Sequence, residues 1–331
     1  MRGRQVCWSD PKLQALARKF IPVCDEVWRL HNLKEVDCLF FQGFCEEGHY
    51  GGPRAHGTTR QGIYCCTPSG RFLGSINTTN PQRMRRMLEA ALERWASIPK
   101  SERYLDEDPK KRRDEIRRRE RQYPEDGLAL RVYTRDGKRK DLPDDWRRTA
   151  WNVDSLWYRK AEARQLLPQR WKKGATQAWP EALVQRLVRH NLVDNVRGQT
   201  NGYGAGHVQE AELVTEIVKV QRDLITVTLR GRSRATTSGR WPKDGSFAEA
   251  SGGEAHARGM QTRLAGRATF DRKTGRFTSF ELAAVGTRWG QTRYNFRQDD
   301  LDEAPIAFAI VLDEDDEGRR VAPAEMGSYG W

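Results

Sequence analysis

The six cysteines are the most reactive side chains of this 331-residue chain, and they are not evenly spread. All six lie within the first 66 residues: Cys7, Cys24, Cys38, Cys45, Cys65 and Cys66. A secreted fold held together by disulfides would distribute its cysteines more widely. Any thiol chemistry is therefore expected in the N-terminal part of the chain.

The stretch "CEEGHYGGPRAH" is the best candidate for a metal site. It carries Cys45, His49 and His56, with two glutamates between the first two. Thiolate and imidazole are ligands that suit zinc or copper, and a loop can wrap around an ion. A fourth ligand would have to come from another cysteine of the cluster. The alternative is a solvated loop that binds no metal.

For three other cysteines, the adjacent pair Cys65–Cys66 and the single Cys7, the sequence makes different predictions. Cys65 and Cys66 lie in an apparent strand, where neighbouring side chains point to opposite faces, so at most one of them faces a core. Buried cysteine behaves as a small apolar residue, which favours packing over a redox couple for this pair. Cys7 precedes a predicted helix, and helix N-termini stabilise thiolates, so it is the best single catalytic candidate.

The stretch "GTRWGQTRYNFRQDD" combines arginines with aromatic residues. Arginine stacks on rings and pairs with phosphate or carboxylate, so this segment is a candidate binding surface. The alternative is an edge strand with an aromatic core face and a solvated arginine face. The residues predicted to bind are Arg288, Trp289, Arg293, Tyr294 and Arg297.

The elements that would position these residues can be placed from local patterns. "SDPKLQALARKF" reads as a capped helix that stops at Pro22, and "IPVCDEVWRLH" as a strand or a second short helix. "DCLFFQGF" is a short apolar run and predicts a buried strand. "GIYCCT" and "FLGSIN" predict two strands around a "PSG" turn. An amphipathic helix follows, capped by Asn80 with Pro81 in its first turn.

Two stretches of the first 96 residues resemble a thioredoxin fold. "DPKLQALARKFIPV" is similar to the helix-then-strand segment that follows the active-site loop in that family. "GTTRQGIYCCTPSGRFLGSINTTNPQRMRRMLEAALERW" resembles the closing hairpin and C-terminal helix. The resemblance implies an α/β thioredoxin-like N-terminal domain and a role in a thiol-redox context.

The chain departs from that family at the positions that carry its chemistry. No Cys-x-x-Cys occurs, and the position that matches the family's cis-proline is about Gln61–Gly62, where there is no proline. Both departures make ordinary disulfide exchange improbable. They favour a binding role over catalysis.

The remainder of the chain predicts a linker and a second domain. We expect a thioredoxin-like domain at 1–98, a charged helical linker at 99–126 and a β-rich domain at 127–331. The last contains several alternating segments with short turns, at Asp136–Gly137, "QRD" and "DRKTGR", together with some helix, and the turn at Asp136–Gly137 is a hairpin signal. These features predict an antiparallel sandwich or an up-and-down barrel.

The amino-acid composition narrows the possible classes of partner but does not identify the function. The net charge of +13 and the pI of about 9.6 favour acidic partners such as nucleic acid, although arginines that only solvate the surface give the same balance. No apolar run is long enough for a membrane span, and no signal peptide precedes the first helix. We therefore expect a cytoplasmic protein, or an extracytoplasmic one if the natural start lies upstream.

Two functional hypotheses remain. The first is a degenerate thioredoxin-like protein with a binding role in a thiol-redox or metal context. The second is a non-enzymatic interaction or scaffold protein whose basic, aromatic β-rich domain binds a polyanion or a protein partner. The missing dithiol favours the second, and the confinement of the cysteines to one domain favours the first.

Overall fold

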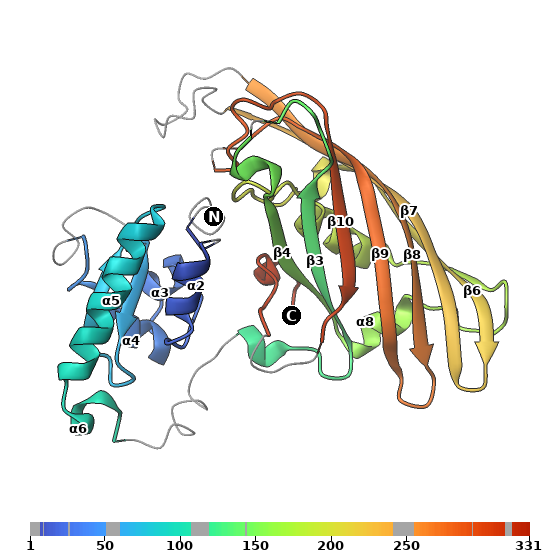
Figure 1. The fold of residues 1–331 in the computed structure, drawn as a ribbon. Helices are drawn as coiled ribbons and strands as arrows, with labels where there is room; N and C mark the ends of the chain where they lie inside the picture. The colour runs from blue at the N-terminus through green and yellow to red at the C-terminus, as the bar shows by residue number, and fades with distance from the viewer. Residues whose placement is uncertain are drawn as a thin grey trace. The chain divides into compact units, whose positions relative to one another are not determined.

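The chain divides into two units in the computed structural model, Met1–Arg118 and Arg119–Trp331 (Figure 1). The boundary falls inside the predicted linker, although residues 107–118 of that linker lie outside the described residues. The structure describes residues 7–8, 10–25, 27–50, 60–106, 119–142, 144–240, 255–292, 294–314 and 320–331.

The first unit contains short helices and one two-stranded sheet in the part that the structure describes. Its small core joins the hairpin, α2 and α5 through Leu13, Leu73, Met84 and Leu88. The elements are α2 (Pro11–Ala17), α3 (Val27–Asn32), α4 (Val36–Cys45), β1 (Ile63–Cys66), β2 (Phe72–Ile76), α5 (Pro81–Ser97) and α6 (Lys100–Arg103).

The predicted hairpin and the helix after it are confirmed. β1 and β2 pair antiparallel, with Tyr64 opposite Ser75. α5 packs against β2 and is capped as predicted, because the Asn80 side chain accepts a hydrogen bond from the backbone N–H of Arg83. The capped amphipathic helix therefore covers the hairpin.

The segment predicted as a buried strand, "DCLFFQGF", is helical instead and forms most of α4. Short apolar runs do not distinguish a strand from a buried helix by periodicity alone. Phe40 and Phe44 are four residues apart and meet edge to face, with ring centroids 5.6 Å apart. Asp37 lies in the first turn, where the helix dipole favours a carboxylate. The run is thus one aromatic face of a helix.

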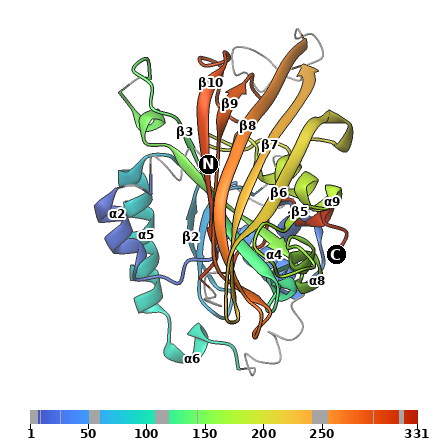
Figure 2. The ribbon, with the colours of Figure 1, turned by 90° about the vertical axis from the view of Figure 1, so that its right-hand side faces the viewer.

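The second unit is built on one large antiparallel sheet (Figure 2). The strand order is β4-β3-β10-β9-β8-β7-β6-β5, so β4 and β5 are the two edges. The strands are β3 (Leu128–Asp136), β4 (Trp151–Tyr158), β5 (Thr176–Ala178), β6 (Val208–Gln221), β7 (Leu224–Arg240), β8 (Ala255–Asp271), β9 (Arg276–Trp289) and β10 (Ala304–Leu312).

The prediction of a β-rich domain is confirmed, but the predicted sandwich or barrel is instead one open eight-stranded sheet. The turns predicted at "QRD" and "DRKTGR" join β6 to β7 and β8 to β9. The turn predicted at Asp136–Gly137 ends β3, but the partner strand β4 begins only at Trp151. A longer loop therefore replaces the expected tight hairpin.

Helices cover the inner face of the sheet. The short helical elements of this unit are η1 (Arg119–Gln122), η2 (Trp146–Arg148), α8 (Lys160–Gln165), α9 (Glu181–Arg186), the π-helical turn η3 (Leu187–Asn191), η4 (Ala205–His207) and η6 (Met326–Ser328). η3 contacts β4 near one edge and also β6 and β7 near the other. A single turn can touch both halves only if the sheet curves around it, so the opposite face is convex.

Side chains from the same helical segment close part of one sheet edge. The backbone carbonyl of Trp157 in β4 accepts a hydrogen bond from Arg186 Nη1 at 2.9 Å. The carbonyl of Ser155 accepts from Asn191 Nδ2 at 3.0 Å. Unpaired edge groups are a template for further strand pairing, and here they are occupied.

Within the described residues, no helix combines the length and the apolarity that crossing a membrane requires.

Candidate functional site

The two faces of the large sheet differ sharply in composition. Side chains alternate along each strand, so every second residue faces the helices. On the inner face, Leu229, Leu264, Leu282 and Phe308 are buried in the main core. The outer face carries the alternate residues, which are mostly exposed. It is therefore the large surface that this unit presents to solvent.

Arginines dominate the outward positions of two neighbouring strands, β7 and β8. The exposed arginines there are Arg230, Arg232, Arg234, Arg263 and Arg267. The register sets Arg232 directly opposite Arg263, with Arg230 opposite Ala265 between the flanking arginines. Directly opposed like charges destabilise a sheet, so this arrangement is unfavourable without a counter-charge.

Most of this charge has no internal partner. Arg232 pairs with Glu212 at 2.9 Å and with Glu210 at 3.4 Å, both on β6. No ion pair or hydrogen bond involves the side chains of the other four arginines among the residues that the structure describes. We call the five residues Arg230, Arg232, Arg234, Arg263 and Arg267 the arginine cluster.

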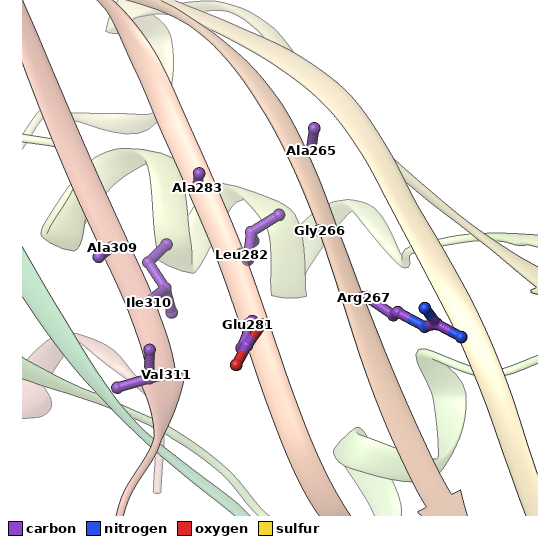
Figure 3. A pocket seen from close by; sticks show the side chains of 9 residues that line it. All are labelled: Ala265, Gly266, Arg267, Glu281, Leu282, Ala283, Ala309, Ile310 and Val311. Carbon is purple, nitrogen blue, oxygen red and sulfur yellow. The ribbon is translucent and has the colours of Figure 1, made fainter.

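A floor of small side chains adjoins the arginine cluster. Ala265, Ala283 and Ala309 lie opposite one another on β8, β9 and β10 and form one row across three strands (Figure 3). Their short side chains leave a shallow depression of about 380 Å³ in the outer face. Arg267 and Glu281 line its end. The backbone of the sheet is therefore more accessible from solvent here than where long side chains cover it.

Aromatic residues stand on the far side of this floor. Tyr133 on β3 lies opposite Ala309, and Trp151 on β4 lies opposite Arg135. The tyrosine is 40% exposed and the tryptophan 54%, and their ring centroids are 6.1 Å apart. Arg135 is exposed as well and has no ion pair within the described chain. We call Tyr133 and Trp151 the aromatic pair.

The residues predicted from "GTRWGQTRYNFRQDD" are only partly on the surface. Arg288 is 1% exposed and Arg297 is 0% exposed, so neither guanidinium can touch a partner directly. Trp289 is half-buried, Tyr294 is 47% exposed, and Arg293 lies outside the described residues. The structure therefore disperses this predicted binding surface.

Arg297 is instead the centre of a buried ion-pair network. Its guanidinium makes two hydrogen bonds to Asp194, of 2.7 and 2.8 Å, and two to Asp136, of 2.7 and 2.9 Å. Asp300 accepts a further bond at 3.0 Å and also pairs with Arg288. Planar bidentate pairing of this kind is the strongest form of ion pair.

The network changes the ionisation of its members in a consistent direction. Burial alone would raise the pKa of Asp194, but the charge of Arg297 and its hydrogen bonds outweigh that and lower it. Burial would likewise raise the pKa of Asp300, and its arginine partners lower it. These carboxylates therefore stay ionised inside the fold and tie the loops around 194 and 297 to the end of β3.

A half-buried acid, Asp154 on β4, has no arginine partner among the residues that the structure describes. It accepts hydrogen bonds from the backbone N–H groups of Ser155 at 2.8 Å and Ala324 at 3.1 Å, and from Asn191 Nδ2 at 3.2 Å. Burial nonetheless raises its pKa to about 6. Neutral donors thus compensate the charge of this carboxylate less than an arginine would.

Cys7 lies in the core of the first unit. It is fully buried beside Leu13 and Cys65, and the N-cap of α2 is Asp10, three residues further along the chain. Burial raises the pKa of the Cys7 thiol, and the charge of Asp10 raises it further. The thiolate that a catalytic role requires is therefore disfavoured.

The predicted metal loop is described only in part, because His56 lies outside the described residues. Burial raises the pKa of Cys45 to about 11, with a further contribution from Glu46. His49 Nε2 donates to the carbonyl of Gln61 at 3.0 Å, which leaves Nδ1 to accept from Ser75 Oγ at 2.8 Å. Both ring nitrogens are thus engaged, and Cys45 is mostly protonated.

A different group in the described chain, Glu35, Asp37 and Cys38, has its ligand atoms close enough together to hold a metal. Arg29 already bonds both carboxylates, at 2.6 and 2.7 Å. Burial also raises the pKa of Cys38. Arg29 thus provides the positive charge that a metal ion would otherwise provide to these carboxylates.

The adjacent cysteines lie as the strand pattern predicts. Cys65 is buried between β1 and α5, and its sulfur lies 4.0 Å from that of Met87. Cys66 is half-buried, and both thiols are free. Burial raises the pKa of each to about 11. Their environment is that of packing residues.

Sequence reasoning missed the arginine cluster, although its signal was present. In "LRGRSR" the arginines at 230, 232 and 234 alternate with Gly231 and Ser233, which is the period of a strand. "QTRLAGR" gives Arg263 and Arg267 the same outward phase on the next strand. Counting charge by strand phase would have found arginines and no acid at the outward positions of this part of β7 and β8.

Comparison of the chain with models of known protein families, with curated proteins and with solved structures found no match.

Proposed function

We propose that the β-rich unit is a binding module for a polyanion, which it holds on the outer face of its sheet. The observation that supports this most is the arginine cluster: five exposed arginines on two adjacent strands, four of them without an internal ion pair in the described chain. A polyanion would supply a counter-charge to the four arginines that have no ion pair in the described chain.

The position of the cluster supports binding over simple solubility. Scattered surface charges of both signs are sufficient to keep a protein in solution. Here the outward positions of β7 and β8 from Thr226 to Ser238 and from Ala257 to Thr269 contain no acid. Same-sign charge focused on one face raises the local concentration and association rate of an oppositely charged ligand.

A thiol-redox or metal role has weaker support. Burial raises the pKa of Cys7, Cys38, Cys45, Cys65 and Cys66. Nucleophilic and metal-binding cysteines need the opposite shift. The N-terminal unit, including its thioredoxin-like hairpin, is then proposed to be a docking module without catalysis of its own.

The test uses the full chain and heparin as a polyanion without bases. The variant replaces Arg230, Arg263 and Arg267 with Gln. The control makes the same charge change at three arginines outside the cluster: Arg83 and Arg86 on α5, and Arg170. We expect the cluster variant to lose at least tenfold in heparin affinity at about 0.1 M salt, and the control to lose less than twofold.

The salt dependence gives an independent readout. Binding through several arginines should weaken steeply as salt rises, and the slope should be shallower for the cluster variant only. An equal loss in both variants would mean that the bulk charge binds and no face does. Absence of heparin binding by the unaltered chain at low salt would overturn the proposal.

A further inference from the structure

We infer that the polyanion is a single-stranded nucleic acid that crosses the sheet from the arginine cluster to the aromatic pair. This inference rests on the proposed function and narrows it to one ligand class. It is supported by the way the strand register places cations, small residues and rings in continuous rows.

The first row runs across the outer face and connects the arginines of β8 with the arginine of β3. From Arg263 on β8 it passes Val285 and Ala307 and reaches Arg135 on β3, with Trp151 beyond it on β4. Three strand spacings separate Arg263 from Arg135, which is about 14 Å. That distance corresponds to at most about four nucleotides of one strand, so a short oligonucleotide can contact both ends.

The second row supplies a smooth path between them. It runs from Arg230 through Ala265, Ala283 and Ala309 to Tyr133. The three alanines line the depression in the outer face, so this row carries only small side chains between Arg230 and Tyr133 (Figure 3). Apolar methyl groups also offer an apolar surface to the flat faces of bases.

The aromatic pair is the feature that heparin or another simple polyanion would not use. Trp151 and Tyr133 keep 54% and 40% of their surface exposed. Bases stack on aromatic side chains of this kind, at about 1–3 kcal/mol for each base. Arg135 lies opposite Trp151 in the register, where it can neutralise the phosphate next to a stacked base.

The shape of the sheet favours one strand over two. η3 contacts both halves of the sheet, so the outer face is convex. Duplex DNA is stiff over about 150 base pairs and would touch a convex face over a short length only. Its bases are also stacked on each other and cannot reach Trp151. A flexible single strand can follow the curvature and offer its bases.

The experiment compares three probes on the full chain: labelled dT12, a 12-base-pair duplex and heparin. The test variant is Trp151→Ala. The matched control is Tyr104→Ala, because Tyr104 is 59% exposed and also contacts a neighbouring ring, that of Trp95 at 6.0 Å. Circular dichroism of both variants verifies that each is folded.

We expect Trp151→Ala to weaken dT12 binding by about 5- to 100-fold, since stacking is lost. The affinity for heparin should stay within twofold, and the control should bind all three probes as the unaltered chain does. Quenching of tryptophan fluorescence by dT12 should be smaller in Trp151→Ala. The duplex should bind more weakly than dT12 at equal salt.

The outcomes separate this inference from the proposed function. Heparin binding through the arginine cluster, with dT12 unaffected by Trp151→Ala, would overturn the single-strand assignment and keep the polyanion site. Duplex binding as tight as dT12 binding, equally insensitive to Trp151→Ala, would do the same. Failure of all three probes would overturn both.

Discussion

The β-rich unit uses arginine in two opposite ways on the two sides of its sheet. Inside, Arg297 is fully buried and meets two carboxylates with paired hydrogen bonds. Outside, Arg263 is exposed, faces another arginine across the strand pair and has no ion pair in the described part of the chain. The positive charge of Arg297 is thus balanced by carboxylates, whereas the positive charge of Arg263 is not balanced within the described chain.

This difference separates a structural role from a binding role. A buried guanidinium must be paired, because removing a charge from water without compensation is very unfavourable. An exposed one is solvated and needs no partner for folding. The buried arginines therefore hold the loops together, and the exposed, unpaired arginines are the ones to which the proposed function assigns a partner.

The largest expected effect comes from breaking the inner network. Arg297→Gln leaves the buried Asp194 without its cation and Asp136 with Arg197 alone, so it should lower the free energy of unfolding by about 3–5 kcal/mol. Urea unfolding followed by circular dichroism measures it. The surface control Arg267→Gln should change the same quantity by less than about 0.5 kcal/mol.

A conservative change refines the first prediction. Lysine keeps the charge but cannot make paired hydrogen bonds to two carboxylates. Arg297→Lys should therefore fall between Arg297→Gln and the unaltered chain. Equal stability of Arg297→Gln and Arg267→Gln would mean that the inner and outer arginines do not differ as described.

The next prediction concerns two acids of the interior, the half-buried Asp154 and the buried Asp194, of which only Asp194 has an arginine partner in the described chain. The pKa of Asp154 is raised to about 6 in the fold, against about 3.9 when unfolded. Between these values the folded state retains a proton that the unfolded state has lost, so its contribution to stability falls as pH rises and is constant above about 7. The decrease amounts to about 2–3 kcal/mol.

Asp154→Asn isolates this contribution from the other carboxylates. The difference in unfolding free energy between the unaltered chain and this variant should decrease from pH 4 to pH 6.5. For Asp194 the sign is reversed: its pKa is lowered, so its contribution is present at neutral pH and is lost as pH falls below about 4. A flat difference curve for Asp154→Asn would refute the assignment.

The smallest expected effect is a gain in stability from a substitution on the outer face. Arg263→Thr removes one of two opposed arginines and introduces a residue that favours strands. Stability should rise by about 0.2–0.5 kcal/mol, while heparin affinity falls. A loss of stability with unchanged heparin affinity would show that Arg263 serves the fold.

Alternation and turn residues were sufficient to predict the long strands of the second unit. "QRD" and "DRKTGR" mark the turns of two hairpins, and the Asn80 cap marks the start of α5. The pattern could not predict that all eight strands share one sheet, because that depends on contacts between distant segments. "DCLFFQGF" failed because an eight-residue apolar run fits a strand as well as a helix.

The site was harder to predict than the fold, for related reasons. The alternation of side chains along β9 alone would have placed Arg288 inside, because residue 288 faces the same side of the strand as the buried Leu282 and Ala284. Arg297 lies in a loop, and two of its three carboxylate partners are 103 and 161 residues away, where no local signal reaches. A local cluster of arginines and rings in the sequence therefore does not imply a surface.

The occupied carbonyls of β4 also limit how this protein can associate with others. An incoming peptide, or a second copy of the sheet, would need Ser155 and Trp157 as acceptors to extend the ladder at the carboxyl half of this strand. Asn191 and Arg186 already hold those positions. Growth by main-chain pairing is blocked there, which guards against fibril-like stacking.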